Sequence, residues 1–208
     1  MQNHFILLNE NLRIGKGGMR ICYLHPSNPN IIIKIEKKGT PYNITPNKWE
    51  YRHYQEIVQA HGEVSGLSRI FGIIETQFGK GLMAEAIRDP DGSLSPTLAK
   101  AIQHPDKWNP SALLKAVKDL MHHICDLDIR LFDFNLENII LQTNQQNELQ
   151  AIIIDLKGHY ANHEWIPISS WFDFFGRKKR DRRILRLIKN LEAKCNKKTN
   201  PNQHNHQC

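Results

Sequence analysis

The stretch LFDFNLENIIL, residues 131–141, contains the pattern that decides the fold class. It places Asp133 five residues before Asn138 and then continues into an apolar run typical of a buried strand. In phosphoryl transfer such an aspartate orients the acceptor hydroxyl and accepts its proton, while the asparagine offers an amide oxygen to Mg²⁺. Either residue alone also suits a turn or a cap, so the surrounding pattern decides between these interpretations.

A second acidic residue ends the next apolar run. Asp155 directly follows the three isoleucines at 152–154, and the polar residues 143–150 between the two runs predict a hairpin loop. A carboxylate at the end of a buried strand can bind a Mg²⁺ ion that bridges ATP phosphates. We therefore predict Asn138 and Asp155 as metal ligands and Asp133 as the catalytic base.

A glycine-rich turn, IGKGGMR at residues 14–20, lies between two strand candidates near the start of the chain. Gly15, Gly17 and Gly18, with Lys16 among them, would let backbone amides approach phosphate oxygens. The turn lacks the spacing of a P-loop, and the strand that follows it excludes a dinucleotide fingerprint, which opens a helix. A tight hairpin turn without a ligand is the alternative.

Lys34 lies within the apolar run IIIKIE, residues 31–36. Desolvating a lysine on such a strand is costly unless an anion meets it, so we expect Lys34 to hold an ATP phosphate. A lysine on an edge strand that reaches solvent is the alternative. Glu50 or Glu56 on the next predicted helix would pair with Lys34, and we favour Glu50.

The order of the expected elements changes near residue 87, from mostly strands to mostly helices. We predict strands, a helix, two more strands, a longer helix with a core-facing apolar stripe and a final pair of strands, at residues 5–8, 20–24, 31–35, 46–60, 70–74, 81–86, 110–126, 138–141 and 151–154. This order predicts an α+β fold with a β-rich lobe at 1–86, a compact helical lobe at 87–195 and a disordered tail at 196–208.

The positive charge is concentrated near the C-terminus. Residues 177–198 contain eleven basic and two acidic side chains, whereas the whole chain carries a formal charge of +7, so the rest is slightly acidic. This distribution argues against a nucleic-acid binder, which would be basic throughout. The apolar spacing within 177–198 predicts an amphipathic helix, either packed on the body or bound to an anionic partner such as a membrane surface or a phosphorylated glycan.

The remaining composition predicts a cytoplasmic protein. Hydrophobic residues make up 40% of the chain, enough for a core, and no apolar run is long enough to span a membrane. The start of the chain lacks the basic region of a secretory signal, and the four cysteines are sparse and irregularly spaced, as expected for free thiols. Peripheral association with the inner face of the membrane is the alternative.

These motifs, in this order, resemble the protein-kinase-like fold: a glycine-rich loop, Lys34, Glu50, Asp133 with Asn138, and Asp155. The resemblance implies that residues 83–87 form a hinge, where backbone groups of Glu85 and Ile87 would meet adenine. More closely, the chain resembles the small bacterial YrbL-type family of PhoP regulatory network proteins. The segments IGKGGMRICYLHP, NIIIKIE, KWEYRHYQE, GLMAEAIRDPDGSLSPTL and FDFNLENIIL, within about residues 8–190, carry this resemblance.

The chain departs from the kinase pattern at four places. Leu131 and Phe132 replace the His and Arg before the aspartate, Arg20 stands where a third loop glycine is expected, and DLKG at 155–158 replaces Asp-Phe-Gly. Asn135 stands where many kinases keep a lysine near the γ-phosphate. The substituted His and Arg leave a pseudokinase, a regulatory binding module with little catalysis, as the alternative function.

The function we expect is that of an ATP- and Mg²⁺-dependent phosphotransferase. Only 53 of the 208 residues follow Asp155, which leaves little room for the helices that bind peptide substrates. We therefore expect the acceptor to be a hydroxyl of a small molecule or a glycan, such as a sugar of the lipopolysaccharide core.

Overall fold

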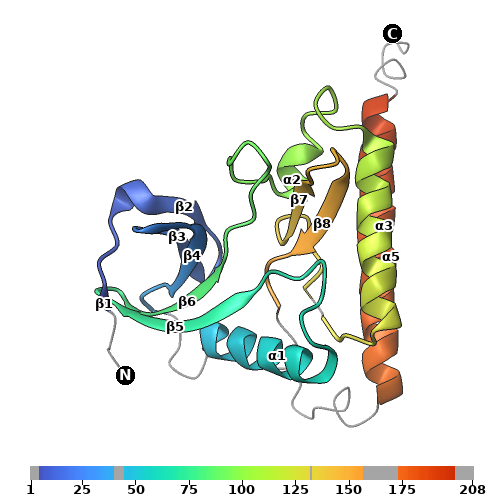
Figure 1. The fold of residues 1–208 in the computed structure, drawn as a ribbon. Helices are drawn as coiled ribbons and strands as arrows, with labels where there is room; N and C mark the ends of the chain where they lie inside the picture. Colours follow the sequence, from blue (N-terminus) through green and yellow to red (C-terminus); the bar gives the residue numbers. More distant parts are fainter. Residues whose placement is uncertain (1–4, 40–44, 132, 157–172, 200–208) are drawn as a thin grey trace.

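The computed structural model describes residues 5–39, 45–131, 133–156 and 173–199 (Figure 1). A six-stranded sheet with one helix beside it forms the first part of the chain. A two-stranded hairpin with two long helices and one short helix forms the second. The mixed α+β class predicted from the sequence is confirmed.

The large sheet has the strand order β1-β5-β6-β4-β3-β2, and its neighbouring strands are antiparallel except for the parallel pair β1 and β5. β4 contains the isoleucine run around Lys34, and β-branched residues favour strands. Cys22 on β3 pairs with Lys34 on β4, which fixes the register of the two strands beside the glycine turn. The strands are β1 (Phe5–Ile6), β2 (Arg13–Lys16), β3 (Arg20–His25), β4 (Asn28–Glu36), β5 (Ile70–Thr76) and β6 (Gly79–Glu85), with a 3₁₀ turn, η1 (Glu10–Leu12), before β2.

Helix α1 (Pro46–His61) runs beneath the sheet and places one acidic side chain in the interior (Figure 1). Proline suits the first turn of a helix, because the amide that it lacks has no partner there. The helix ends at His61 and is capped by Gly62, whose φ of 74° favours glycine. Its buried side chains include Asn47 and Glu50, and both face the sheet strands beside the glycine turn.

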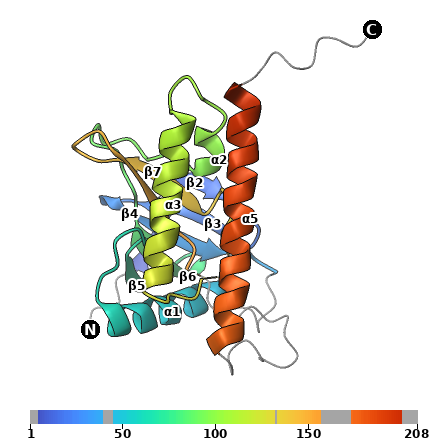
Figure 2. The same ribbon diagram turned by 90° about the vertical axis from the view of Figure 1, so that its right-hand side faces the viewer.

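The second part of the chain is organised around α3 (Pro110–Asp126) and α5 (Asp173–Thr199), which lie side by side in Figure 2. The side chain of Asn109 caps α3 by accepting a hydrogen bond from the amide of Ser111. A short helix, α2 (Leu98–Ala101), and the hairpin of β7 (Ile139–Thr143) and β8 (Leu149–Ile153) complete this part. Its core is lined by the buried residues Leu113, Ala116, Val117, Leu120, Met121 and Ile124 of α3 and Ile184, Leu187 and Leu191 of α5.

Most predicted elements are confirmed within a few residues, but the short helix α2 was not predicted. β1 ends at Ile6, because only two residues of the predicted strand pair with β5, and β2 was not predicted. The expectation of a disordered tail is wrong for residues 196–199, which form the last turn of α5. The other residues of that tail lie outside the described part.

Of the helices that the structure describes, none combines the length and the apolar composition needed to cross a lipid bilayer.

Candidate functional site

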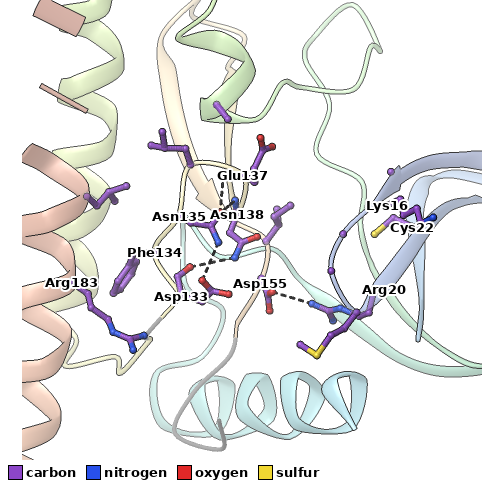
Figure 3. A pocket seen from close by; sticks show the side chains of 18 of the residues that line it. Lys16, Arg20, Cys22, Asp133, Phe134, Asn135, Glu137, Asn138, Asp155 and Arg183 are labelled. Atoms are coloured by element: carbon purple, nitrogen blue, oxygen red, sulfur yellow. Dashed lines mark hydrogen bonds and ion pairs between the residues drawn. The ribbon is translucent and has the colours of Figure 1, made fainter. Parts of the chain in front are cut away.

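A pocket of about 1320 Å³ lies where the sheet meets the second part of the chain (Figure 3). The glycine turn and Lys34 border it on the sheet side, and one face of α5 borders it on the other. Most of the predicted site residues line it together. Its polar and charged lining residues are Lys16, Arg20, Cys22, Lys34, Asp133, Asn135, Glu137, Asn138, Asp155, Arg183, Arg186, Asn190 and Lys194.

The segment after α3 presents Asp133 to the pocket. Asn135 donates a hydrogen bond from Nδ2 to Oδ1 of Asp133 over 3.0 Å, and its own Oδ1 accepts bonds from the amides of Glu137 and Asn138. The Asp133 carboxylate is therefore held by a side chain that is itself fixed by two backbone groups (Figure 3). The sequence suggested that Asn135 replaces a phosphate-binding lysine, whereas in the structure it positions Asp133.

The hairpin register brings Asn138 beside Asp155. Ile139 pairs with Ile153, and one step further the amide of Ile154 donates to the carbonyl of Asn138 over 3.0 Å. Nδ2 of Asn138 donates to the carbonyl of Asp133, although at 3.4 Å this bond is long. Asn138, just before β7, and Asp155, just after β8, thus place two oxygen-bearing side chains at one edge of the pocket.

Lys34 forms a buried ion pair with Glu50. The Nζ–Oε1 distance is 2.7 Å, and Nζ also donates to the carbonyl of Ile154. Glu56 points elsewhere and pairs with Arg52 on the exposed side of α1. Of the two alternatives that the sequence left open, the structure pairs Lys34 with Glu50, and the bond to Ile154 ties the sheet to the segment that carries Asp155.

Arg20 joins this ion pair to the predicted metal ligand. Its guanidinium donates to Oε2 of Glu50, and its Nη2 lies 3.1 Å from Oδ2 of Asp155 (Figure 3). Burial alone would raise the pKa of Glu50, but the charges and hydrogen bonds of Arg20 and Lys34 outweigh it and lower this pKa to about 2. Although burial opposes it, contact with Glu50 and Asp155 raises the pKa of Arg20. Four charged groups, two of each sign, therefore form one buried network.

Sequence reasoning missed the part that Arg20 and Asn47 play in this network. Asn47 donates from Nδ2 to the carbonyl of Lys34 over 2.8 Å, and its Oδ1 accepts a long bond, 3.4 Å, from Arg20. The strand period held a signal, because Arg20 lies two residues from Cys22, the partner of Lys34, and therefore on the same face of the sheet. Asn47 stands three residues before Glu50, one helical turn away on the same side of α1.

Hydrogen bonds hold the glycine turn in place, and the packing around it does not require glycine at positions 15, 17 or 18. The amide of Gly17 donates to the carbonyl of Arg20, and Lys37 donates to the carbonyls of Gly17 and Gly18. A Cβ built on Gly15 or Gly18 would meet no atom within 4 Å, and one on Gly17 would lie 3.7 Å from the nearest. The missing side chains therefore leave the backbone accessible from the pocket instead of relieving a clash.

Glu85 and Ile87, the predicted adenine-binding positions, are not among the residues that line this pocket. The side chain of Glu85 pairs with Arg69 over 3.0 Å, and the amide of Glu85 donates to the carbonyl of Arg69. Ile87 is buried in a small apolar cluster with Ile140 and Ile152. The structure thus does not bring these two residues together with the glycine turn, and their contact with adenine stays a prediction.

The fold and the pocket together define an α+β protein in which the glycine turn, the buried ion network and the segment that carries Asp133 meet at one large pocket. The model of the family described as PhoP regulatory network protein YrbL matches residues 6–192, and the chain belongs to this family. The uncharacterized protein YrbL of Escherichia coli (strain K12) is 27% identical over 184 residues, which cover 88% of this chain and 86% of the relative. The protein of the same name from Shigella flexneri matches to the same extent.

Proposed function

We propose that this protein is a kinase-like phosphotransferase of the bacterial cytoplasm that moves the γ-phosphoryl group of ATP, with Mg²⁺, to a hydroxyl of a small molecule or glycan. The proposal includes a two-lobed kinase-like fold, with lobes at residues 1–86 and 87–195. The observation that carries it is the convergence of the Lys34–Glu50 ion pair, Asp133, Asn138 and Asp155 on the pocket beside the glycine turn.

Each residue has a separate task in this proposal. The glycine turn and Lys34 bind the ATP phosphates. Glu50 holds the Lys34 ammonium in place through an ion pair with an Nζ–Oε1 distance of 2.7 Å. Asp133, fixed by Asn135, orients the acceptor hydroxyl and accepts its proton. Most of the rate gain would come from positioning and charge neutralisation, as in other phosphoryl transfers.

The donor set at the end of the hairpin fits Mg²⁺. Asn138 and Asp155 offer oxygen atoms, and the described residues contain no group of three or more His, Cys, Asp or Glu side chains that could hold a metal by itself. Mg²⁺ commonly binds through one or two carboxylates together with substrate phosphates and water, so an incomplete protein cage suits it. When bound with ATP, this ion would neutralise charge on the phosphates.

Calorimetric titration of the full chain with ATP, with and without Mg²⁺, tests the proposal. We expect saturable binding that Mg²⁺ strengthens, and Asp155→Asn should remove the strengthening. Asp133→Ala should keep nucleotide binding but lower acceptor-dependent turnover by about 100-fold or more, because a general base contributes that much.

Asp106→Asn is the matched control, since Asp106 is exposed and does not line the pocket. Absence of binding at millimolar ATP would refute the proposal. Unchanged Mg²⁺ dependence in Asp155→Asn would refute the metal-binding role of this residue.

One observation favours the alternative, a nucleotide-binding regulatory module without turnover. Arg20 pairs with the carboxylate that would bind Mg²⁺, and Lys34 is already bonded to Glu50 and to the carbonyl of Ile154. Such a module would bind ATP but show no ATP consumption above that of Asp133→Ala. If Asp133→Ala consumes less ATP than the wild type, the protein is a phosphotransferase and not a regulatory module.

A further inference from the structure

Helix α5 is fixed in place, so the side chains on its pocket side have defined positions. Arg177 and Arg180 both bind Asp128 through contacts of about 2.9 Å near the start of the helix. Lys118 of α3 binds Glu192 over 2.9 Å near the other end. Together with the buried apolar face, these contacts hold α5 firmly against α3 and against Asp128, which follows α3.

A second face of α5 opens into the pocket. Arg183, Arg186, Asn190 and Lys194 line it, at spacings of three or four residues that place them along one side of the helix. We call these four residues the α5 stripe. In Figure 3, Arg183 lies on one side of Asp133, while Arg20 and Lys16 lie on the opposite side. The α5 stripe is therefore across the predicted base from the phosphate-binding turn.

Arg186 and Lys194 of the α5 stripe carry positive charge that no described carboxylate of their own helix pairs with. Within the described part of the chain, Arg186 and Lys194 have no carboxylate at ion-pair distance, and two acidic residues of the helix pair elsewhere, Asp181 with Arg180 and Glu192 with Lys118. The pocket is lined by six basic and three acidic side chains. A concave surface with one sign of charge in excess concentrates ligands of the opposite sign.

The pocket is also large enough for more than a nucleotide. Its volume of about 1320 Å³ exceeds the roughly 300–1,000 Å³ that is typical of a site for one small ligand. A second ligand would therefore lie between Asp133 and α5, where the positive charge is.

We propose that the α5 stripe is the acceptor subsite and that the acceptor is a small anionic molecule, carrying a phosphate or carboxylate group beside the hydroxyl that reacts. This inference rests on the proposed function. Arg186 and Lys194 bind the anionic group and direct the hydroxyl toward Asp133. The acceptor oxygen then forms a bond to the γ-phosphorus, the bond from that phosphorus to the β–γ bridging oxygen breaks, Asp133 takes the hydroxyl proton and ADP leaves.

Calorimetric titration with inorganic phosphate tests the subsite, with the nucleotide site first saturated by a non-hydrolysable ATP analogue and Mg²⁺. We expect saturable phosphate binding to the wild type, weakened about tenfold or more in the double variant Arg186→Gln/Lys194→Gln. The matched control is Arg182→Gln/Lys189→Gln, which removes the same charge from exposed positions of α5 that do not line the pocket. It should bind phosphate as the wild type does.

Three outcomes would overturn the inference. The first two are a wild type that binds the analogue but not phosphate, and equal weakening of phosphate binding in both double variants. The third is loss of analogue binding in Arg186→Gln/Lys194→Gln, which would assign the stripe to the nucleotide. A wild type that cannot bind the analogue refutes the proposed function instead. Sedimentation with phosphatidylglycerol vesicles but not with phosphatidylcholine vesicles, in the absence of phosphate binding, would assign the stripe to a membrane surface.

Discussion

Two groups of basic side chains line opposite sides of the same pocket, and they differ in burial and in pairing. On the sheet side, Arg20 and Lys34 are buried, with exposed fractions of 9% and 4%, and they pair with Glu50 and Asp155. On the helix side, Arg186 and Lys194 are exposed and lack a carboxylate partner among the described residues.

This difference separates what holds the molecule together from what is available to a ligand. A buried charge must be paired, so the sheet-side residues are part of the fold and their geometry is set before anything binds. An exposed charge is solvated and tolerates the lack of a partner, so the helix-side residues can exchange water for an anion. The predictions below test this contrast, beginning with the largest effect.

Glu50→Gln should give the largest loss of stability. It leaves Arg20 and Lys34 buried with only Asp155 to balance them, and breaking a buried ion pair costs about 3–5 kcal/mol. Urea unfolding measures the loss. Glu56→Gln, which breaks the exposed pair with Arg52, should change the free energy of unfolding by about 0.5 kcal/mol or less. Similar losses in the two variants would contradict the network.

Lowering the pH should reduce the free energy of unfolding within a defined pH range, because Glu50 on the sheet side becomes protonated. The pKa of Glu50 is lowered from 4.5 to about 2 in the folded protein, so the unfolded chain takes up a proton first as the pH falls. The stability that Glu50 contributes is complete above pH 4.5 and is lost as the pH falls through about 2. Urea unfolding of the wild type and Glu50→Gln over this range should show their difference shrinking. A constant difference would show that the charge of Glu50 is not responsible.

Asp128→Asn should give a smaller loss, on the helix side. Burial alone would raise the pKa of Asp128, but its bonds to Arg177 and Arg180 lower it, and Arg180 is buried. Asparagine tolerates the φ of 52° at this position, so the change removes charge without backbone strain. We expect a loss of about 1–2 kcal/mol in thermal unfolding, together with weaker phosphate binding by the α5 stripe. Asp119→Asn, at an exposed pair with Lys115, is the control and should do neither.

The sheet side was the more predictable of the two. Its strands are short β-branched runs, and Lys34 within such a run requires an acidic partner, which the helix beginning at Pro46 supplies as Glu50. The placement of Arg20 was missed because it was compared with a glycine pattern, although strand alternation put it on the face of Lys34.

The helix side could be predicted only as an amphipathic helix. The spacing of Ile184, Leu187, Ile188 and Leu191 predicted its apolar face. Three of these side chains are buried as expected, and Ile188 is half-buried. Which of its basic residues face the pocket depends on how α5 packs against α3 and on the bonds to Asp128, and neither follows from the local pattern. The same holds for Glu85 and Ile87, whose surroundings are set by packing that no motif describes.

The ion pair between Arg20 and Asp155 has a consequence for the order in which ligands would be added. If Asp155 binds Mg²⁺, the ion must first displace a guanidinium, so the metal alone should bind weakly. A nucleotide that arrives with the metal offers its phosphates to the displaced guanidinium, which recovers part of that cost. Metal and nucleotide would then bind with positive cooperativity, each strengthening the affinity for the other by the same factor.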